Sequence, residues 1–219
     1  MALGWYRLCI SVEKKGVFLL KKRSFCALAL FLAAALLLTG CMPCISFSAR
    51  RAERVKKPET PAGYLEYKNV IKNFAISYPS HWEIDRNSTG DVISFYNWDW
   101  DWEEGYALSD WVTVIREDLE DYGSLRDYVY AIDRHYSLSS PDYKRISYTE
   151  TRLNGLTAIE VVCQTSFGEG EEEINQIVQT FLRYRGSIFH INAGAPVANF
   201  RSTEGTLRTV TGTFYPLED

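Results

Sequence analysis

The sequence predicts an α+β fold in which a central antiparallel β-sheet is flanked by helices. Three observations support this prediction. Short segments of alternating or β-branched residues, bounded by turn residues, recur from residue 64 to the C-terminus. Asn154-Gly155 separates two of these segments, as the turn of a tight hairpin does. Two longer segments have the apolar spacing of amphipathic helices. A sheet with segregated helices forms an α/β/α sandwich, and we expect residues 64–219 to fold as one such domain.

Eight segments are predicted as strands from their alternation and bounding turns. They are Tyr64–Asn69, Phe74–Tyr78, Asp91–Tyr96, Trp111–Glu117, Tyr143–Arg152, Thr157–Phe167, Ile174–Arg185 and Ser187–Asn192. Asn154 and Gly155 tolerate the two positive φ angles of a type I′ turn, and Gly186 is placed to turn the next hairpin. Strands joined by such short turns pair with their neighbours, so the sheet is predicted to be antiparallel.

Two segments are predicted as helices, Ser124–Leu138 and Pro196–Thr211. In the first, Ser124 and Asp127 make a plausible capping pair ahead of an apolar stripe. The apolar positions expected to face the core are Leu125, Tyr128, Val129, Ile132 and Tyr136 in the first helix and Phe200, Leu207 and Val210 in the second.

The N-terminus has the layout of a secretory signal peptide. Residues 21–23 are basic, Phe25–Leu38 is apolar, and small residues follow. Leu38-Thr39-Gly40-Cys41 resembles the lipobox of bacterial lipoproteins. That resemblance implies that residues 1–40 are a signal peptide with an N-terminal extension, and that Cys41 becomes the mature N-terminus. Cys41 would then carry a thioether-linked diacylglycerol and an N-acyl chain such as palmitate.

An uncleaved signal anchor is the alternative for this region, because extension of the apolar run to Cys44 would reach the length of a membrane span. In both interpretations the basic residues stay on the cytoplasmic side. We therefore expect the folded domain at the cell membrane, anchored and facing the extracytoplasmic side. Neither Cys44, in the tether, nor Cys163, in an apolar strand, is expected to form a structural disulfide.

Residues 41–63 are expected to form a lipidated tether. The stretch 46–63 holds five basic and two acidic residues, two prolines and few large apolar residues, so it cannot bury a core. Its basic residues would be attracted to anionic headgroups, although an ordinary solvated linker has the same composition. By contrast, residues 64–219 hold 13 basic and 25 acidic residues. We expect no nucleic-acid partner, because binding to phosphates requires a basic surface.

A series of short motifs resembles the PsbP-like superfamily. In order, they are Phe74-x-Ile76-x-Tyr78-Pro79-x-x-Trp82, Val92 to Phe95, Val112 with Val114, Leu125-x-x-Tyr128, Gly155-Leu156-x-Ala158-x-Glu160-Val161, Gly186-x-x-Phe189-x-Ile191 and Thr213-Phe214. The resemblance implies a central antiparallel sheet with helices on its faces. Members include an extrinsic photosystem II subunit and bacterial lipoproteins of unassigned role. The family thus implies extracytoplasmic binding or assembly rather than catalysis, and no functional residue can be matched position by position.

Sequence motifs for catalysis are absent. His81, His135 and His190 lack metal-ligand spacing, and the chain contains no nucleophile elbow, P-loop or dinucleotide-binding fingerprint. We therefore expect no enzyme activity and no cofactor. An unrecognised hydrolase, whose site comes together only in the folded chain, is kept as an alternative.

The most unusual stretch alternates tryptophan with acidic residues from Trp98 to Glu103. An extended backbone would place one kind on each side of the strand. The candidate binding surface consists of Trp98, Trp100 and Trp102, because tryptophan is enriched at interface hot spots. The candidate metal ligands are Asp99, Asp101, Glu103 and Asp110, because Ca²⁺ favours several carboxylate oxygens. Alternatively, the tryptophans cover the sheet edge and the acids are merely solvated.

These observations lead to three hypotheses of function. The first is a membrane-anchored, non-catalytic binding or assembly module, whose partners are the lipid bilayer, through acylated Cys41, and another protein at the membrane surface. The second is a calcium-binding extrinsic membrane protein of the PsbP type. The third is the unrecognised hydrolase.

Overall fold

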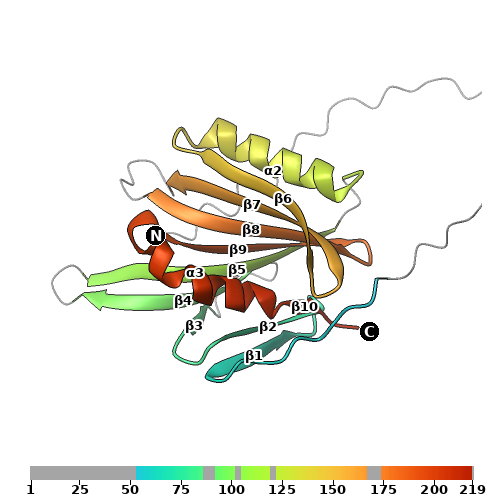
Figure 1. Cartoon of the computed structure of the whole chain (residues 1–219), viewed down its shortest axis with the longest axis horizontal. Coiled ribbons are helices and arrows are strands. Elements are labelled where there is room, and N and C mark those ends of the chain that lie inside the picture. The colour runs from blue at the N-terminus through green and yellow to red at the C-terminus, as the bar shows by residue number, and fades with distance from the viewer. Residues whose placement is uncertain (1–52, 86–91, 102–104, 119–121, 167–173, 219) are drawn as a thin grey trace, which may run out of the picture. The chain divides into compact units, whose positions relative to one another are not determined.

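The computed structural model describes residues 53–85, 92–101, 105–118, 122–166 and 174–218, and they form an α+β domain as predicted (Figure 1). The strands are β1 (Tyr64–Asn69), β2 (Phe74–Pro79), β3 (Glu83–Asp85), β4 (Val92–Asp101), β5 (Gly105–Asp118), β6 (Lys144–Leu153), β7 (Leu156–Ser166), β8 (Ile174–Tyr184), β9 (Ser187–Pro196) and β10 (Tyr215–Pro216). The helices are α2 (Leu125–Ser139) and α3 (Val197–Gly212).

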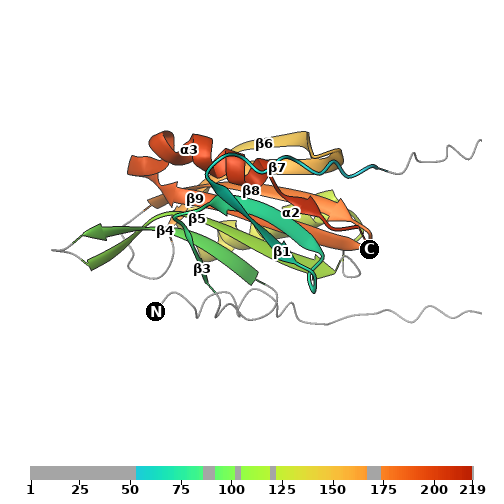
Figure 2. The ribbon, with the colours of Figure 1, turned by 90° about the horizontal axis from the view of Figure 1, so that it is seen from below.

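The strands form two antiparallel sheets. The larger has seven strands in the order β3-β4-β5-β9-β8-β7-β6, and the smaller has the order β1-β2-β10. Helix α3 and the small sheet cover one face of the large sheet, and α2 packs on the other face, against β7 and β8. Figure 2 shows the large sheet nearly edge-on, with α3 on one side. The expected helix–sheet–helix layering is therefore present, with the small sheet as an addition.

Both predicted hairpin turns are confirmed. Asn154 and Gly155 have φ angles of 48° and 90°, as a type I′ turn requires, and Leu153 pairs with Leu156 across it. Arg185 and Gly186 have φ angles of 46° and 83° between β8 and β9. These two turns set the antiparallel register of β6 with β7 and of β8 with β9.

The faces of the sheet follow the predicted alternation. Ile159 and Val161 face α2, in a cluster with Tyr128, Val129 and Phe181. The larger core lies on the other face, where the predicted α3 residues are all buried against the two sheets. It includes Phe74, Phe95, Val178, Leu182, Phe189, Ile191, Phe200, Leu207, Val210 and Phe214. The capping pair of α2 is also present, because Ser124 Oγ accepts from the Asp127 N–H at 3.2 Å.

The structure differs from the predicted elements mainly in the strands at the sheet edge. Strand β4 continues to Asp101 and β5 already begins at Gly105, so residues outside the predicted strands Asp91–Tyr96 and Trp111–Glu117 are part of a long hairpin. Aspartate is disfavoured in strands, so the segment in which it alternates with tryptophan was not among the predicted strands. The two shortest strands, β3 and β10, were not predicted, because two or three residues give no periodic signal.

The compact unit begins at Glu53, eleven residues before the predicted domain boundary. Lys56 N–H donates to the carbonyl of Asn154 at 2.8 Å, and the Glu53 carboxylate accepts from the backbone N–H of Thr157 at 3.1 Å. Residues 53–63, named the N-terminal arm below, therefore dock on the β6–β7 hairpin. The predicted signal peptide and Cys41 lie outside the described residues. Within the described part of the chain, no helix is long and apolar enough to cross a membrane.

Asn154 joins the β6–β7 hairpin to the end of α3. Its side-chain amide donates to the carbonyls of Gly212 at 2.8 Å and Phe214 at 2.7 Å. We expect Asn154→Ala to destabilise the domain by about 2 kcal/mol, because two partly buried carbonyls lose their donor and a positive φ becomes less favourable. Chemical denaturation measures this, with Asn154→Asp as the control that keeps the turn but removes the donor. Unchanged stability of Asn154→Ala would show that neither bond matters.

Candidate functional site

The β4–β5 hairpin extends beyond the rest of the large sheet. Strand β9 pairs with β5 only from Trp111 onward, and β3 pairs with β4 only at residues 94–96. From Asn97 to Asp101 and from Gly105 to Asp110, these two strands pair only with each other among the described residues. We call this two-stranded part the ribbon. In both views it projects from one end of the domain (Figure 1 and Figure 2).

The ribbon carries the tryptophan–acid segment singled out in the sequence. Trp98 pairs with Leu108, Asp99 with Ala107, Trp100 with Tyr106, and Asp101 with Gly105. The backbone of Trp98 to Asp101 is therefore extended. Trp102 and Glu103 lie outside the described residues.

Asp110 lies at the base of the ribbon and is buried, with 4% of its surface exposed. Its carboxylate accepts from the Asn97 side-chain amide at 3.3 Å, opposite it in the register. A β-bulge interrupts the pairing between Asn97 and Trp98, just beyond this pair. Among the described residues, no three His, Cys, Asp or Glu side chains are grouped so that they could hold a metal ion. Calcium binding, for which Glu103 was one expected ligand, stays a prediction.

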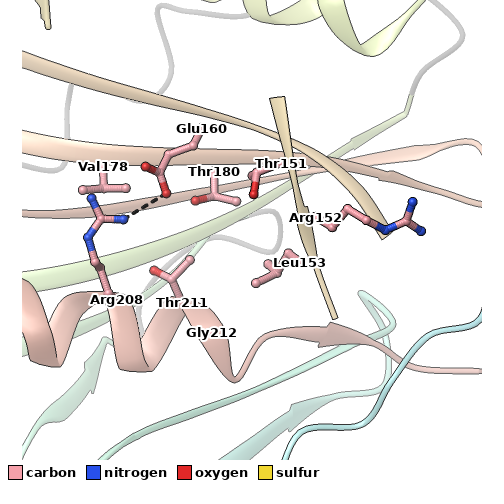
Figure 3. Close-up of a pocket in the computed structure, with 9 residues that line it drawn as sticks. All are labelled: Thr151, Arg152, Leu153, Glu160, Val178, Thr180, Arg208, Thr211 and Gly212. Atoms are coloured by element: carbon pink, nitrogen blue, oxygen red, sulfur yellow. Dashed lines mark hydrogen bonds and ion pairs between the residues drawn. The ribbon is translucent and has the colours of Figure 1, made fainter. Parts of the chain in front are cut away.

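A pocket of about 120 Å³ lies between the large sheet and the C-terminal half of α3 (Figure 3). Its residues come from β6, β7, β8 and α3: Thr151, Arg152, Leu153, Glu160, Val178, Thr180, Arg208, Thr211 and Gly212. Arg208 Nη1 contacts Glu160 Oε2 at 3.0 Å, and its Nε contacts Glu204 Oε1 at 2.7 Å. The guanidinium is thus shared between two carboxylates.

The hydroxyls of Thr180 and Thr211 line the same pocket, and neither has a hydrogen-bond partner in the described part of the protein. Both residues are more than nine-tenths buried. Buried hydroxyls of this kind commonly bind ordered water. The charged side chains that line the pocket are Arg152, Glu160 and Arg208.

The titratable groups that are most perturbed lie inside the core. Burial lowers the pKa of His190 to about 3, and the hydrogen bond to Asn192 opposes this shift. The imidazole stacks on Phe181 with ring centroids 4.1 Å apart. Burial also raises the pKa of the Cys163 thiol to about 12, and that cysteine forms no disulfide. His190 is therefore neutral and Cys163 is a protonated thiol at physiological pH, so neither is suited to acid–base or nucleophilic catalysis.

A row of buried polar side chains crosses the face of the large sheet that carries α2. Ser94 pairs with Thr113, Thr113 with Asn192, and Asn192 with Gln179 in the strand register. Ser94 and Thr113 hydrogen-bond to each other at 3.1 Å, and Gln179 donates to Asn192 at 3.1 Å. Because these side chains hydrogen-bond in two pairs, one between β4 and β5 and one between β8 and β9, they are satisfied within the sheet and support its register.

Comparisons with known proteins find similarity at the level of the fold. The solution structure of cyanobacterial PsbP (CyanoP) from Synechocystis sp. PCC 6803 matches with a TM-score of 0.50 and 16% identity, over 71% of this chain and 94% of that one. The chain has a PsbP-like fold. No protein-family model matches the sequence, and no curated protein matches it.

Two further structures share this PsbP-like fold. PA94 from Pseudomonas aeruginosa, a protein of unknown function and putative regulator, matches with a TM-score of 0.50 and 13% identity, over 71% of this chain and 99% of that one. The Ran-binding protein Mog1p from Saccharomyces cerevisiae matches with a TM-score of 0.50 and 11% identity, over 71% of this chain and 96% of that one. At such identities the likeness concerns the fold alone.

Proposed function

We propose that this protein is a lipid-anchored, extracytoplasmic module that binds another protein at the membrane surface and does not catalyse a reaction. The observation that carries the proposal is the ribbon. It projects from the domain, places Trp98 and Trp100 on an extended backbone, and has no further strand beside it among the described residues.

An open two-stranded ribbon offers two means of binding. Its outer backbone groups can pair with an extended segment of a partner, because strand addition needs only an unpaired edge. Its tryptophans can supply the large contact area that dominates many interfaces. The acidic residues of the segment would add charge complementarity toward a basic partner surface.

Several features support the non-catalytic part of the proposal. His190 and Cys163 are buried with pKa values that leave them neutral, and the ion pairs that line the α3 pocket are already made. The structural neighbours support the fold, but no functional residue can be transferred from them to this chain. A hydrolase remains the alternative that an activity screen with generic ester and peptide substrates would detect.

The lipid anchor is proposed from the sequence around Cys41. The N-terminal arm is compatible with it, because Glu53 already docks on the domain and lies twelve residues after Cys41. We expect Cys41→Ala to move the protein from the membrane to the soluble fraction when cells are fractionated, with Cys44→Ala as the matched control. Unchanged membrane association of Cys41→Ala would contradict acylation at that residue.

Photo-crosslinking in intact cells tests the ribbon as the binding surface. A photoreactive amino acid in place of Trp100 is expected to give a discrete protein adduct. The control position is Tyr130, on α2, which is 66% exposed but lies away from the ribbon. Equal adducts from both positions, or none from position 100, would contradict the proposal.

A further inference from the structure

The turn between β1 and β2 exposes two adjacent apolar side chains to solvent. Ile71 is 82% exposed and Val70 is 73% exposed, among the highest values for large apolar residues in the described chain. We call residues 70–73 the tip. Its shape is fixed locally, because Lys72 N–H donates to Asn69 Oδ1 at 2.9 Å and Asn73 has a φ of 54°. The apolar pair is therefore presented by a formed turn.

Lysines lie in the tip and on the small sheet that carries it. Lys68 and Lys57 both contact the Glu66 carboxylate, at 3.0 and 3.3 Å, so two cations share one anion and a net positive charge remains. Both lysine side chains are at least half exposed. Lys72 lies in the tip itself. An exposed apolar pair with lysines on the same small sheet suits the interface of an anionic bilayer, where apolar groups enter the acyl boundary and lysines lie among headgroups.

The chain that leads toward Cys41 reaches the same small sheet, because Lys57 of the N-terminal arm contacts Glu66 of β1. The twelve residue steps from Cys41 to Glu53 span at most about 40 Å, which would keep an anchored domain beside the membrane. The C-terminal segment also lies beside the tip, since Leu217 N–H donates to the Asn73 carbonyl, and the acidic Glu218 that follows it offsets part of the lysine charge there. Both views place this C-terminal end away from the ribbon.

The ribbon and the small sheet also differ in charge, because lysines accompany Glu66 and Glu218 at the end with the tip, whereas the charged residues of the ribbon are all acidic. Residues 97–110, which include the ribbon, hold five acidic and no basic residues. An anionic membrane would repel that segment and attract the lysines around the tip. The domain would thus be oriented with the tip on the bilayer and the ribbon exposed to partners.

We propose that the tip is a membrane-contact site, which inserts Val70 and Ile71 into an anionic bilayer surface and sets Lys57, Lys68 and Lys72 among the headgroups. Its location at a membrane rests on the lipid anchor proposed above, but its affinity for lipid does not depend on acylation. Two apolar residues alone anchor a protein weakly, so the tip orients a domain that the acyl chains retain.

The test uses the unlipidated chain 42–219, which contains the whole compact unit Glu53–Asp219 with all its core clusters. Co-sedimentation with phosphatidylglycerol-containing vesicles is compared with pure phosphatidylcholine vesicles. We expect binding to the anionic vesicles only, about tenfold weaker in the double variant Val70→Ser/Ile71→Ser. Leu138→Ser is the matched control, because Leu138 is 79% exposed on α2, and it should bind as the wild type does.

A second measurement reports insertion directly. With Cys44→Ser, a polarity-sensitive fluorophore on Ile71→Cys should shift to shorter wavelength on anionic vesicles, and the same fluorophore on Leu138→Cys should not. Equal binding of the double Ser variant and the wild type, or equal binding to neutral and anionic vesicles, would overturn the proposal. So would self-association of the wild type that the double Ser variant loses, because the tip would then contact a second copy. Fractionation of Cys41→Ala is scored separately, so failure of the anchor and failure of the tip are distinguishable.

Discussion

Lowering the pH from 7 to 4 is expected to cost the domain about 3 kcal/mol of folding free energy through one side chain, His190. The pKa of this imidazole falls to about 3 in the fold from an ordinary value of 6.5, because burial disfavours the charged form. Above pH 6.5 neither state takes up a proton there. Between pH 6.5 and 3 only the unfolded state does, so each unit of acidification costs about 1.4 kcal/mol.

Comparison with a variant isolates the contribution of this residue from that of the carboxylates. His190→Phe keeps a flat ring to stack on Phe181 and removes the titration, whereas His81 and His135 stay in both proteins. Free energies of unfolding, measured by urea denaturation from pH 7 to 4, should decrease more steeply for the wild type, by about 3 kcal/mol over this range. If the free energies of unfolding of the two proteins decreased in parallel with pH, protonation of His190 would not destabilise the fold, and the prediction would be wrong.

Gly194→Ala is expected to destabilise the domain by about 2 to 3 kcal/mol, because the Trp111 indole lies directly over this glycine. A Cβ on Gly194 would come within 2.5 Å of Trp111 Cζ2 and 2.8 Å of Cε2. The two residues are paired across β5 and β9, and Trp111 is 4% exposed, so the ring has little room to move. Thermal and urea unfolding measure the loss.

Two further variants make the Gly194 prediction specific. Gly205→Ala adds the same methyl group within α3, where a Cβ would meet nothing within 4 Å, and it should stabilise the protein by about 0.5 to 1 kcal/mol. Trp111→Leu should lessen the added cost of Gly194→Ala, since the contact would be gone. A cost that is the same with and without the indole would mean that the strand backbone, not Trp111, excludes alanine.

Local patterns predicted most of the fold. The turns at Asn154-Gly155 and Arg185-Gly186 are visible because few residue types tolerate their φ angles. The inward faces of α2 and α3 follow from helical periodicity. The length of the β4–β5 hairpin was missed, since Asp99 and Asp101 have low strand propensity and the neighbouring strand is what extends them.

The candidate sites depend on contacts between residues far apart in the sequence. The exposed tip could have been suspected from Val70 and Ile71, which lie between two predicted strands with Lys72, but their exposure is a tertiary property. Arg208 meets Glu160 only because α3 returns across β7. The docking of the N-terminal arm had no sequence signal, because residues 53–57 have the composition of a solvated linker.

The affinity of the purified domain for the protein crosslinked from position 100 is the most direct test of the proposed function. We expect the double variant Trp98→Ser/Trp100→Ser to bind at least about 30-fold more weakly than the wild type, as loss of interface hot spots does, with an unchanged melting temperature. Tyr130→Ser should bind as the wild type does. Equal affinities of the wild type and the tryptophan variant would contradict the assignment of the ribbon as the binding surface.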